Sequence, residues 1–220
     1  GLGDVYKRQP IYGGKYTKMI LEDLLEQYGI EPDLWPEYHL IKDGDVIEIG
    51  SIKIETIASS HTCFDSFGFI IFSEHTTLYH TGDMKIDGST YFRKPTNIKR
   101  IKELSNQIDC VVADFYGIDD DGFAVREVDT FKKLVKIIKS SKKDKIFLPF
   151  YPTHPEMYII AFLSAFKLKK NVVFFGNPDF YSYLKRIIDY GISFTDMARS
   201  RIKVIYTHNR EEIATLDNNY

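Results

Sequence analysis

The chain has 220 residues, 44% of them hydrophobic and 27% charged, and its 29 basic and 31 acidic side chains give a formal charge of -2. This is the composition of a folded globular protein; it excludes a disordered chain and an overall basic charge directed at nucleic acid, although local basic patches stay open. Two cysteines exclude a disulfide framework and a CxxC metal pair. No apolar run approaches membrane-spanning length, so we expect no membrane contact and a cytoplasmic location.

The first half of the chain predicts a helix followed by a sheet. Residues 1–9 show no periodicity and are expected to be a non-native tail. Apolar residues recur at i, i+1, i+4, i+5 and i+8 over residues 16–28, which predicts an amphipathic helix that ends at Gly29. Four apolar or alternating runs predict a β-hairpin and its continuation, at residues 46–49, 52–57, 67–72 and 77–79.

In the second half, after about residue 94, strands alternate with helices. Helices are predicted at residues 98–104, 131–138, 156–166 and 180–190. Strands are predicted at residues 110–113, which should be buried, and at 146–148, 172–175 and 202–206. This alternation implies parallel strands joined by crossover helices. The sequence therefore predicts an α/β protein in two parts, residues 10–94 and 95–220.

Two residue types that bind metals flank the two central apolar runs. His61 precedes the first run and Asp83, in Thr-Gly-Asp, follows the second. Because an antiparallel pair brings these ends to the same rim of a sheet, both side chains could reach one ion, and imidazole and carboxylate are good zinc ligands. Taken singly, such a histidine is more often a capping or core residue and such an aspartate a turn residue. A catalytic site also usually needs three protein ligands.

The segment SHTCFDSFGFII, followed by LYHTGDMKID, closely resembles the ribonuclease J branch of the metallo-β-lactamase superfamily. That family carries a histidine before a Pro/Asp-Ser segment and a strand, and then His-Thr-Gly-Asp-x-Lys-x-Asp. PIYGGKYTKMILEDLLEQYGI is similar to its proline-tyrosine-glycine segment and helix, and VVADFYGIDDDGFAVREV to the start of its inserted β-CASP domain. The likeness implies a partial metallo-β-lactamase sheet at 10–94 and a partial β-CASP-like parallel α/β domain at 95–220.

The resemblance implies a role for several residues. His61 would be a metal ligand, and Asp83 would be the catalytic carboxylate that bridges two zinc ions. Asp114 would support the metals, and Asp65 and Ser66 would shape the rim. In the family, two zinc ions serve hydrolysis of an RNA phosphodiester, and a homodimer is plausible by the same likeness.

The sequence also departs from the family. The His-x-His-x-Asp-His cluster is absent from the 220 residues, so we expect a truncated chain that binds zinc weakly and is inactive unless the rest of the gene supplies those ligands. Thr153 and His154 stand where the family holds RNA phosphates, but Pro155 or Glu156 replaces its arginine, which alone makes bidentate phosphate contacts. His154 is equally readable as the residue ahead of a helix-starting proline.

Two alternatives to a ribonuclease therefore stay open: a metallo-hydrolase with a substrate other than RNA, and a degenerate member that binds nucleic acid or protein without catalysis. A run of lysines between residues 132 and 145 favours a solvated helix face, with phosphate binding as the less common alternative.

Overall fold

The computed structural model describes residues 9–88, 90, 94–119, 121–122, 125–143, 145–151, 153–176, 183, 185–187, 189–190 and 202–206, the last five and residues 175–176 as backbone alone. Two compact units make up the chain, Gly1–Glu127 and Val128–Tyr220. The boundary predicted near residue 94 separates the two domains that the family resemblance implies, which is a different division from these compact units. It stays a prediction.

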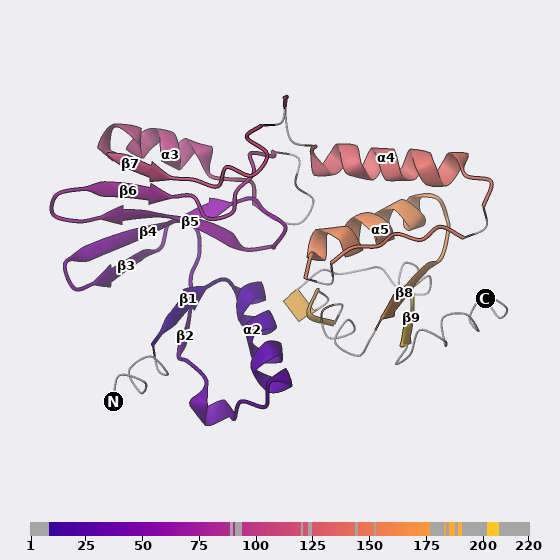
Figure 1. The fold of residues 1–220 in the computed structure, drawn as a ribbon, viewed down its shortest axis with the longest axis horizontal. Coiled ribbons are helices and arrows are strands. Elements are labelled where there is room, and N and C mark those ends of the chain that lie inside the picture. Colours follow the sequence, from indigo (N-terminus) through magenta and orange to yellow (C-terminus); the bar gives the residue numbers. More distant parts are fainter. Residues whose placement is uncertain are drawn as a thin grey trace. The chain divides into compact units, whose positions relative to one another are not determined.

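Unit 1 is built on a five-stranded sheet (Figure 1). Its strands, in spatial order, are β3 (Val46–Ile49), β4 (Ile52–Ser59), β5 (Ser66–Phe72), β6 (Thr77–His80) and β7 (Cys110–Val112). The first four pair antiparallel, whereas β6 and β7 pair parallel. The chain passes from β6 to β7 through α3 (Ile98–Leu104) and the 3-10 turn η2 (Ser105–Gln107), as a parallel pair requires.

A second, smaller part of unit 1 surrounds the first helix. Strand β1 (Ile11–Gly13) pairs parallel with β2 (Tyr38–Leu40), and α2 (Lys15–Gln27) and the 3-10 turn η1 (Pro32–Leu34) lie between them in the chain. The predicted helix at residues 16–28 is thus confirmed, and it stops before Gly29, whose φ of +66° is a left-handed conformation that glycine adopts readily.

The core of the sheet lies under α3. Ile57, Ile70 and Tyr79 of the three central strands form one buried cluster with Leu104 of α3. The helix is also fixed by a bidentate ion pair, because the Arg100 guanidinium donates from Nε and Nη2 to the two carboxylate oxygens of Glu55 at 2.6 and 3.0 Å. The planar guanidinium donates two parallel hydrogen bonds to one carboxylate, which is the strong geometry for such a pair.

The strand predicted at residues 110–113 is confirmed as β7, but β7 is exposed, so the prediction that it is buried is wrong. All three residues of β7 are exposed, Val111 to 55%. β7 is the last strand of its sheet, so that within the described residues it has a ladder partner on one side only. An apolar triplet reads as buried in a sequence, but its position in the sheet decides its exposure.

Unit 2 contains most of α4 (Glu127–Ser140), α5 (Pro155–Lys167) and the parallel pair of β8 (Val172–Gly176) and β9 (Ile202–Tyr206). The helices predicted at 98–104, 131–138 and 156–166 and the strands at 172–175 and 202–206 are confirmed. Residues 146–148 form no strand, and Phe147 is 66% exposed, so that prediction is wrong; an apolar triplet makes a strand only where a partner strand lies beside it. Of the helix predicted at 180–190, residues 183, 185–187 and 189–190 are described and are helical, and the others lie outside the described residues.

The fold class is therefore mixed α/β, as predicted. Within the described part of the chain, no helix combines the length and the apolar character that crossing a membrane demands.

Candidate metal centre

The ends of β4 and β6 meet at one edge of the five-stranded sheet. Both strands pair antiparallel with β5, so β4 and β6 run in the same direction. The segments that follow them are tied together: the backbone N–H of Lys85 donates to the carbonyl of Ser60 at 2.7 Å, and the Ser59 hydroxyl donates to the carbonyl of Asp83 at 3.4 Å. The loop after β4 and the turn after β6 are consequently neighbours, although about twenty residues separate them in the chain.

His61 and Asp83 face each other across this edge. The Nδ1 atom of His61 lies 4.0 Å from Oδ2 of Asp83, and 3.3 Å from the hydroxyl of Thr62. The His61 side chain is 32% exposed and that of Asp83 is 78% exposed, so the pair opens toward solvent. The structure thus brings together the two residues that the sequence singles out.

The turn that carries Asp83 depends on a glycine. Gly82 has φ of +60°, and a Cβ built on it would lie 2.8 Å from the carbonyl oxygen of Phe67 on β5. Its backbone N–H donates to Nδ1 of His80 at 3.0 Å, so the second conspicuous histidine of the motif stabilises the turn. Only a residue without a side chain allows the turn this close to β5, which fixes where the Asp83 carboxylate can project.

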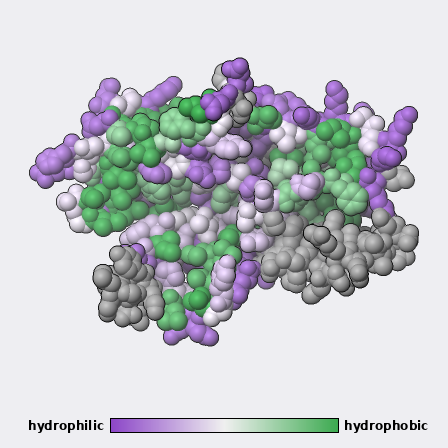
Figure 2. All heavy atoms as spheres, viewed as in Figure 1, coloured by the Kyte–Doolittle hydropathy of each residue, from purple (hydrophilic) through white to green (hydrophobic). Residues whose placement is uncertain are grey.

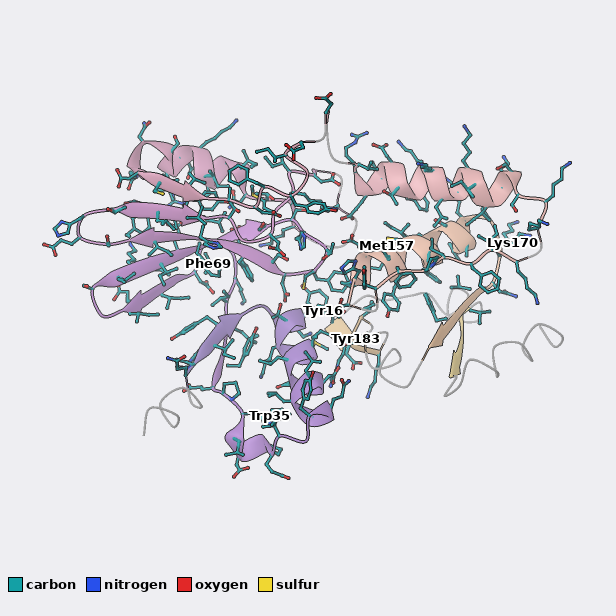
Figure 3. All side chains as sticks on the ribbon, viewed as in Figure 1. Tyr16, Trp35, Phe69, Met157, Lys170 and Tyr183 are labelled. Carbon is teal, nitrogen blue, oxygen red and sulfur yellow. The ribbon has the colours of Figure 1, made fainter. Side chains whose placement is uncertain are left out.

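Asp65 ties the loop of His61 to α2. Its Oδ2 atom accepts a hydrogen bond from the backbone N–H of Tyr16 at 2.7 Å, and its Oδ1 atom accepts one from the Thr17 hydroxyl at 3.4 Å. Gly14 precedes this helix, and a Cβ there would lie 2.1 Å from Cγ of Asp65. Figure 3 labels Tyr16 at the start of α2. Asp65 therefore acts as the N-terminal cap of a helix that has no cap of its own, and it holds the loop in place.

The Asp65 carboxylate and its neighbours are shielded from water, and the pKa values of three of these groups are raised as a result. Burial raises the pKa of Asp65, while hydrogen bonds from Tyr16 and Thr17 lower it in part. Burial, with the Asp65 carboxylate nearby, raises the pKa of Cys63 to about 11 and that of Tyr38 to about 12. Desolvation disfavours the ionised form of each of these acids, so the thiol and the phenol stay neutral near pH 7.

The other predicted supporting residues lie near the same edge. Ser66 begins β5 opposite Ser59, next to the loop of His61. Asp114 follows β7, and its backbone N–H donates to the Thr81 hydroxyl at 3.2 Å. The Asp114 carboxylate accepts from the backbone N–H of Tyr116 at 2.9 Å, which closes a local turn. The backbone of Asp114 is thus placed beside the Thr-Gly-Asp turn.

Thr153 and His154 belong to the other compact unit. His154 is the residue before α5, with Pro155 at the first helical position, and its ring is tilted against that of Tyr151 at 5.3 Å between centroids. This is the helix-start geometry that the sequence offered as one of two interpretations of His154. Contact of Thr153 and His154 with substrate phosphates stays a prediction.

Asp87, the last residue of the motif, has no role that its sequence pattern predicts. Asp87 is 5% exposed, and its Oδ2 atom accepts from the backbone N–H of Glu127 at 2.9 Å, at the first residue of α4. The buried Glu127 carboxylate lies 3.4 Å from Nζ of Lys85. Because Lys85 and Asp87 both belong to the motif, the motif could have marked them as functional or structural residues. It could not have predicted which groups their side chains contact.

The pair of His61 and Asp83 fits one metal ion in part. Two ligand atoms about 2.0–2.2 Å from a tetrahedral zinc ion lie about 3.4 Å apart, so Nδ1 of His61 and Oδ2 of Asp83, which are 4.0 Å apart, would have to move closer together to share an ion. Imidazole nitrogen and carboxylate oxygen are suitable donors. Structural zinc sites use about four protein donors and catalytic sites about three. Among the described residues, no three His, Cys, Asp or Glu side chains are grouped to hold an ion.

Comparison with known sequences supports the class of protein that this edge indicates. The chain is 24% identical over 147 residues to ribonuclease J of Thermus thermophilus, an alignment that covers 66% of this chain and 25% of that protein. It is 22% identical over 98 residues to ribonuclease J 2 of Staphylococcus aureus, covering 44% of this chain and 17% of that protein. The chain therefore spans about a quarter, or less, of the length of these relatives. No family model matches it.

Comparison with solved structures supports the fold. A protein of unknown function from Enterococcus faecalis superposes over 92% of this chain and 54% of its own, with a TM-score of 0.59 and 16% identity. A metallo-β-lactamase fold protein from Bacillus subtilis matches 35% of this chain and 28% of its own at a TM-score of 0.26 and 16% identity, too low to support an argument.

These findings define an α/β protein. Its sequence homology supports a family of metallo-hydrolases. More particularly, the resemblance to ribonuclease J is confirmed, at low identity and over part of the chain.

Proposed function

We propose that the protein to which this chain belongs is a metal-dependent hydrolase that cleaves phosphodiester bonds in RNA. The observation that carries the proposal is the approach of His61 and Asp83 to 4.0 Å at one sheet edge, in a chain that is similar to proteins named ribonuclease J. We propose RNA as the substrate because of the names of those relatives. We propose a metal ion because imidazole and carboxylate are metal donors and because of the homology.

In this proposal His61 would be a terminal zinc ligand, and Asp83 would be the carboxylate shared by two ions. Metal ions held there would act as Lewis acids on the phosphodiester. Asp65 and Ser66 position the loop of His61, and Asp114 supports the turn of Asp83. Thr153 and His154 contact substrate phosphates. In the domain organisation that belongs to this proposal, residues 1–9 are a tail, 10–94 a partial metallo-β-lactamase-like domain and 95–220 a partial β-CASP-like domain.

The first test is zinc binding by this chain, measured by competition with a chromophoric chelator. The wild-type chain should bind zinc weakly, and His61→Gln or Asp83→Asn should each lower the affinity further. His75→Gln and Asp121→Asn are matched controls, because both side chains are exposed, and His75 lies in the turn between β5 and β6, at the end of these strands opposite Asp83. Equal affinity in all five proteins would refute the ligand assignment, and nanomolar binding by the wild-type chain would refute the expectation of weak binding.

The second test is cleavage by the full-length protein that carries this sequence. We expect it to cleave 5′-monophosphorylated RNA in the presence of zinc and to lose that activity on Asp83→Asn. Cleavage confined to a substrate other than RNA would favour the metallo-hydrolase alternative. Zinc-dependent folding with no cleavage of RNA or DNA would favour a binding protein.

A further inference from the structure

Positive charge is concentrated in one stretch of the chain. Residues 128–176 contain ten lysines and three acidic residues, a formal charge of +7, whereas the whole chain carries -2. The rest of the chain, with 19 basic and 28 acidic residues, therefore has a charge of -9. The stretch contains no arginine. Such asymmetry between two parts of one chain indicates a surface for a charged partner.

On α4 the lysines form a stripe. Lys132, Lys136 and Lys139 are spaced i, i+4 and i+7, which places them along one side of the helix over about 10 Å. All three are exposed, and an ion pair of 3.9 Å joins Lys132 to Asp129. Lys136 and Lys139 have no acidic residue three or four positions away. Like charges at these spacings destabilise a helix, so a purely solvated face would be expected to alternate charges.

Three more exposed lysines lie at the end of α5 and just after it. The ammonium group of Lys167 lies 5.4 Å from the centroid of the Phe131 ring on α4, so the two helices are in contact at this point. Lys167, Lys169 and Lys170 are all exposed, and Figure 3 labels Lys170 just past the end of α5. Lys169 has φ of +56°, a left-handed conformation in which helices usually place glycine. A charged side chain thus occupies a position that glycine would fill more easily.

We propose that Lys132, Lys136 and Lys139 of α4, with Lys167, Lys169 and Lys170 after them, form a lysine surface that binds the phosphate backbone of nucleic acid without reading its sequence. Lysine supplies a flexible point charge rather than the bidentate fork of arginine, which suits phosphates presented at variable positions. Figure 2 shows hydrophilic side chains projecting along the outer edge of this part of the molecule.

An anionic membrane is the other partner that a basic helix can fit, and the packing of α4 argues against it. A helix that lies on a membrane exposes a broad apolar face beside its cations. On α4 the apolar residues Leu134, Val135 and Ile138 are half-buried, and Ile137, at 49%, is the exposed one. Nucleic acid needs only the cations, and it is the partner that this surface favours.

The proposal rests on the proposed function only in taking RNA as the nucleic acid, and its test is independent of cleavage. The wild-type chain is titrated with a labelled single-stranded RNA of mixed sequence, in EDTA, and binding is followed by fluorescence anisotropy between about 50 and 200 mM salt. The variant is Lys132→Gln/Lys136→Gln/Lys139→Gln. The matched control, Lys53→Gln/Lys99→Gln/Lys102→Gln, removes three exposed lysines of unit 1 and changes the net charge equally. Circular dichroism shows whether both remain folded.

We expect the α4 variant to bind RNA roughly 10- to 100-fold more weakly at about 0.1 M salt and its salt slope to be shallower by about 2, since each lost phosphate contact removes about 0.7. The control should differ little from wild type. Equal losses in variant and control, or none in either, would refute the lysine surface. Tighter binding to vesicles of phosphatidylserine and phosphatidylcholine than to RNA, lost in the variant, would assign the surface to membranes instead. Because binding is measured in EDTA, where no metal-dependent cleavage occurs, failed cleavage and failed binding remain distinguishable.

Discussion

The carboxylate of Asp65 accepts a hydrogen bond from the backbone N–H of Tyr16, 49 residues earlier in the chain, at a distance of 2.7 Å. The first N–H groups of a helix have no partner inside it, and the positive end of its dipole favours an anion. Gly14, at the N-cap position, has no side chain to offer. A single contact therefore completes α2 and fixes the loop that presents His61.

Removal of this cap should destabilise the protein. We expect Asp65→Ala to lower the free energy of unfolding by about 1–2 kcal/mol, the usual cost of a lost N-terminal cap, and Asp65→Asn to cost less because it keeps an acceptor oxygen. Urea denaturation followed by circular dichroism measures both. Asp121→Ala, at an exposed position, is the control and should change stability by less than about 0.5 kcal/mol. An effect of Asp65→Ala no larger than that of the control would contradict the capping role.

The same carboxyl should make stability depend on pH. Burial raises the pKa of Asp65 above its ordinary value, so the folded protein binds this proton more tightly than the unfolded chain does. The resulting stability is fully present below the unfolded pKa and is lost as the pH rises through the folded pKa. The advantage of wild type over Asp65→Asn should therefore be largest in acid and decrease toward neutral pH. Urea denaturation of both proteins from about pH 3 to 7 tests this, and a constant difference would refute it.

A side chain at position 82 should disturb the turn of Asp83. Gly82→Ala places a Cβ 2.8 Å from the Phe67 carbonyl oxygen and forces a left-handed conformation on alanine, so we expect a loss of about 1–3 kcal/mol and weaker zinc binding. Gly88→Ala is the matched control, because a Cβ at Gly88 would meet no atom within 4 Å. Thermal unfolding and chelator competition provide the two measurements. Similar losses in the two variants would show that the close approach at Gly82 does not matter.

The two cysteines should react with thiol reagents at very different rates. Burial raises the pKa of the Cys63 thiol to about 11, so only about one molecule in a thousand carries the thiolate at pH 8. Cys110 is exposed on β7. Titration with an aromatic disulfide reagent should give one fast and one slow thiol, and Cys110→Ser should remove the fast phase. A fast phase that persists in Cys110→Ser would show that Cys63 is accessible and ionised.

Asp87 should stabilise the start of α4. Its carboxylate is buried and accepts the backbone N–H of Glu127, the first residue of that helix. We expect Asp87→Ala to lower the free energy of unfolding by about 1–2 kcal/mol, with Asp87→Asn intermediate. Hydrogen exchange should show faster exchange at the N–H of Glu127 in both variants. Unchanged exchange there would mean that another group holds this end of the helix.

Local pattern was enough to predict most of the elements. The apolar spacing of α2 and the apolar run of α5 reflect which side chains must leave water, and that requirement acts within each element. In β4 the β-branched residues indicate the strand, but burial does not alternate along it, since Glu55, Thr56 and Ile57 are all buried. The approach of His61 to Asp83 also followed from the sequence, because antiparallel pairing leaves two such strand ends little choice of edge. Where a short apolar run had to be judged by itself, the strand predicted at residues 146–148 and the burial predicted for β7 were wrong. Three residues carry no periodicity, and their burial depends on what lies beside them.

The sequence by itself therefore determined the α/β class, the order of most of the elements and the pair of metal-binding residue types at one edge of a sheet. Only the tertiary structure decided what holds that edge in place: Asp65 on the start of α2, Gly82 against β5, and Asp87 at the start of α4. These contacts join residues far apart in the chain. Their energies depend on burial and on which backbone groups lack partners, and neither is fixed until the elements have packed.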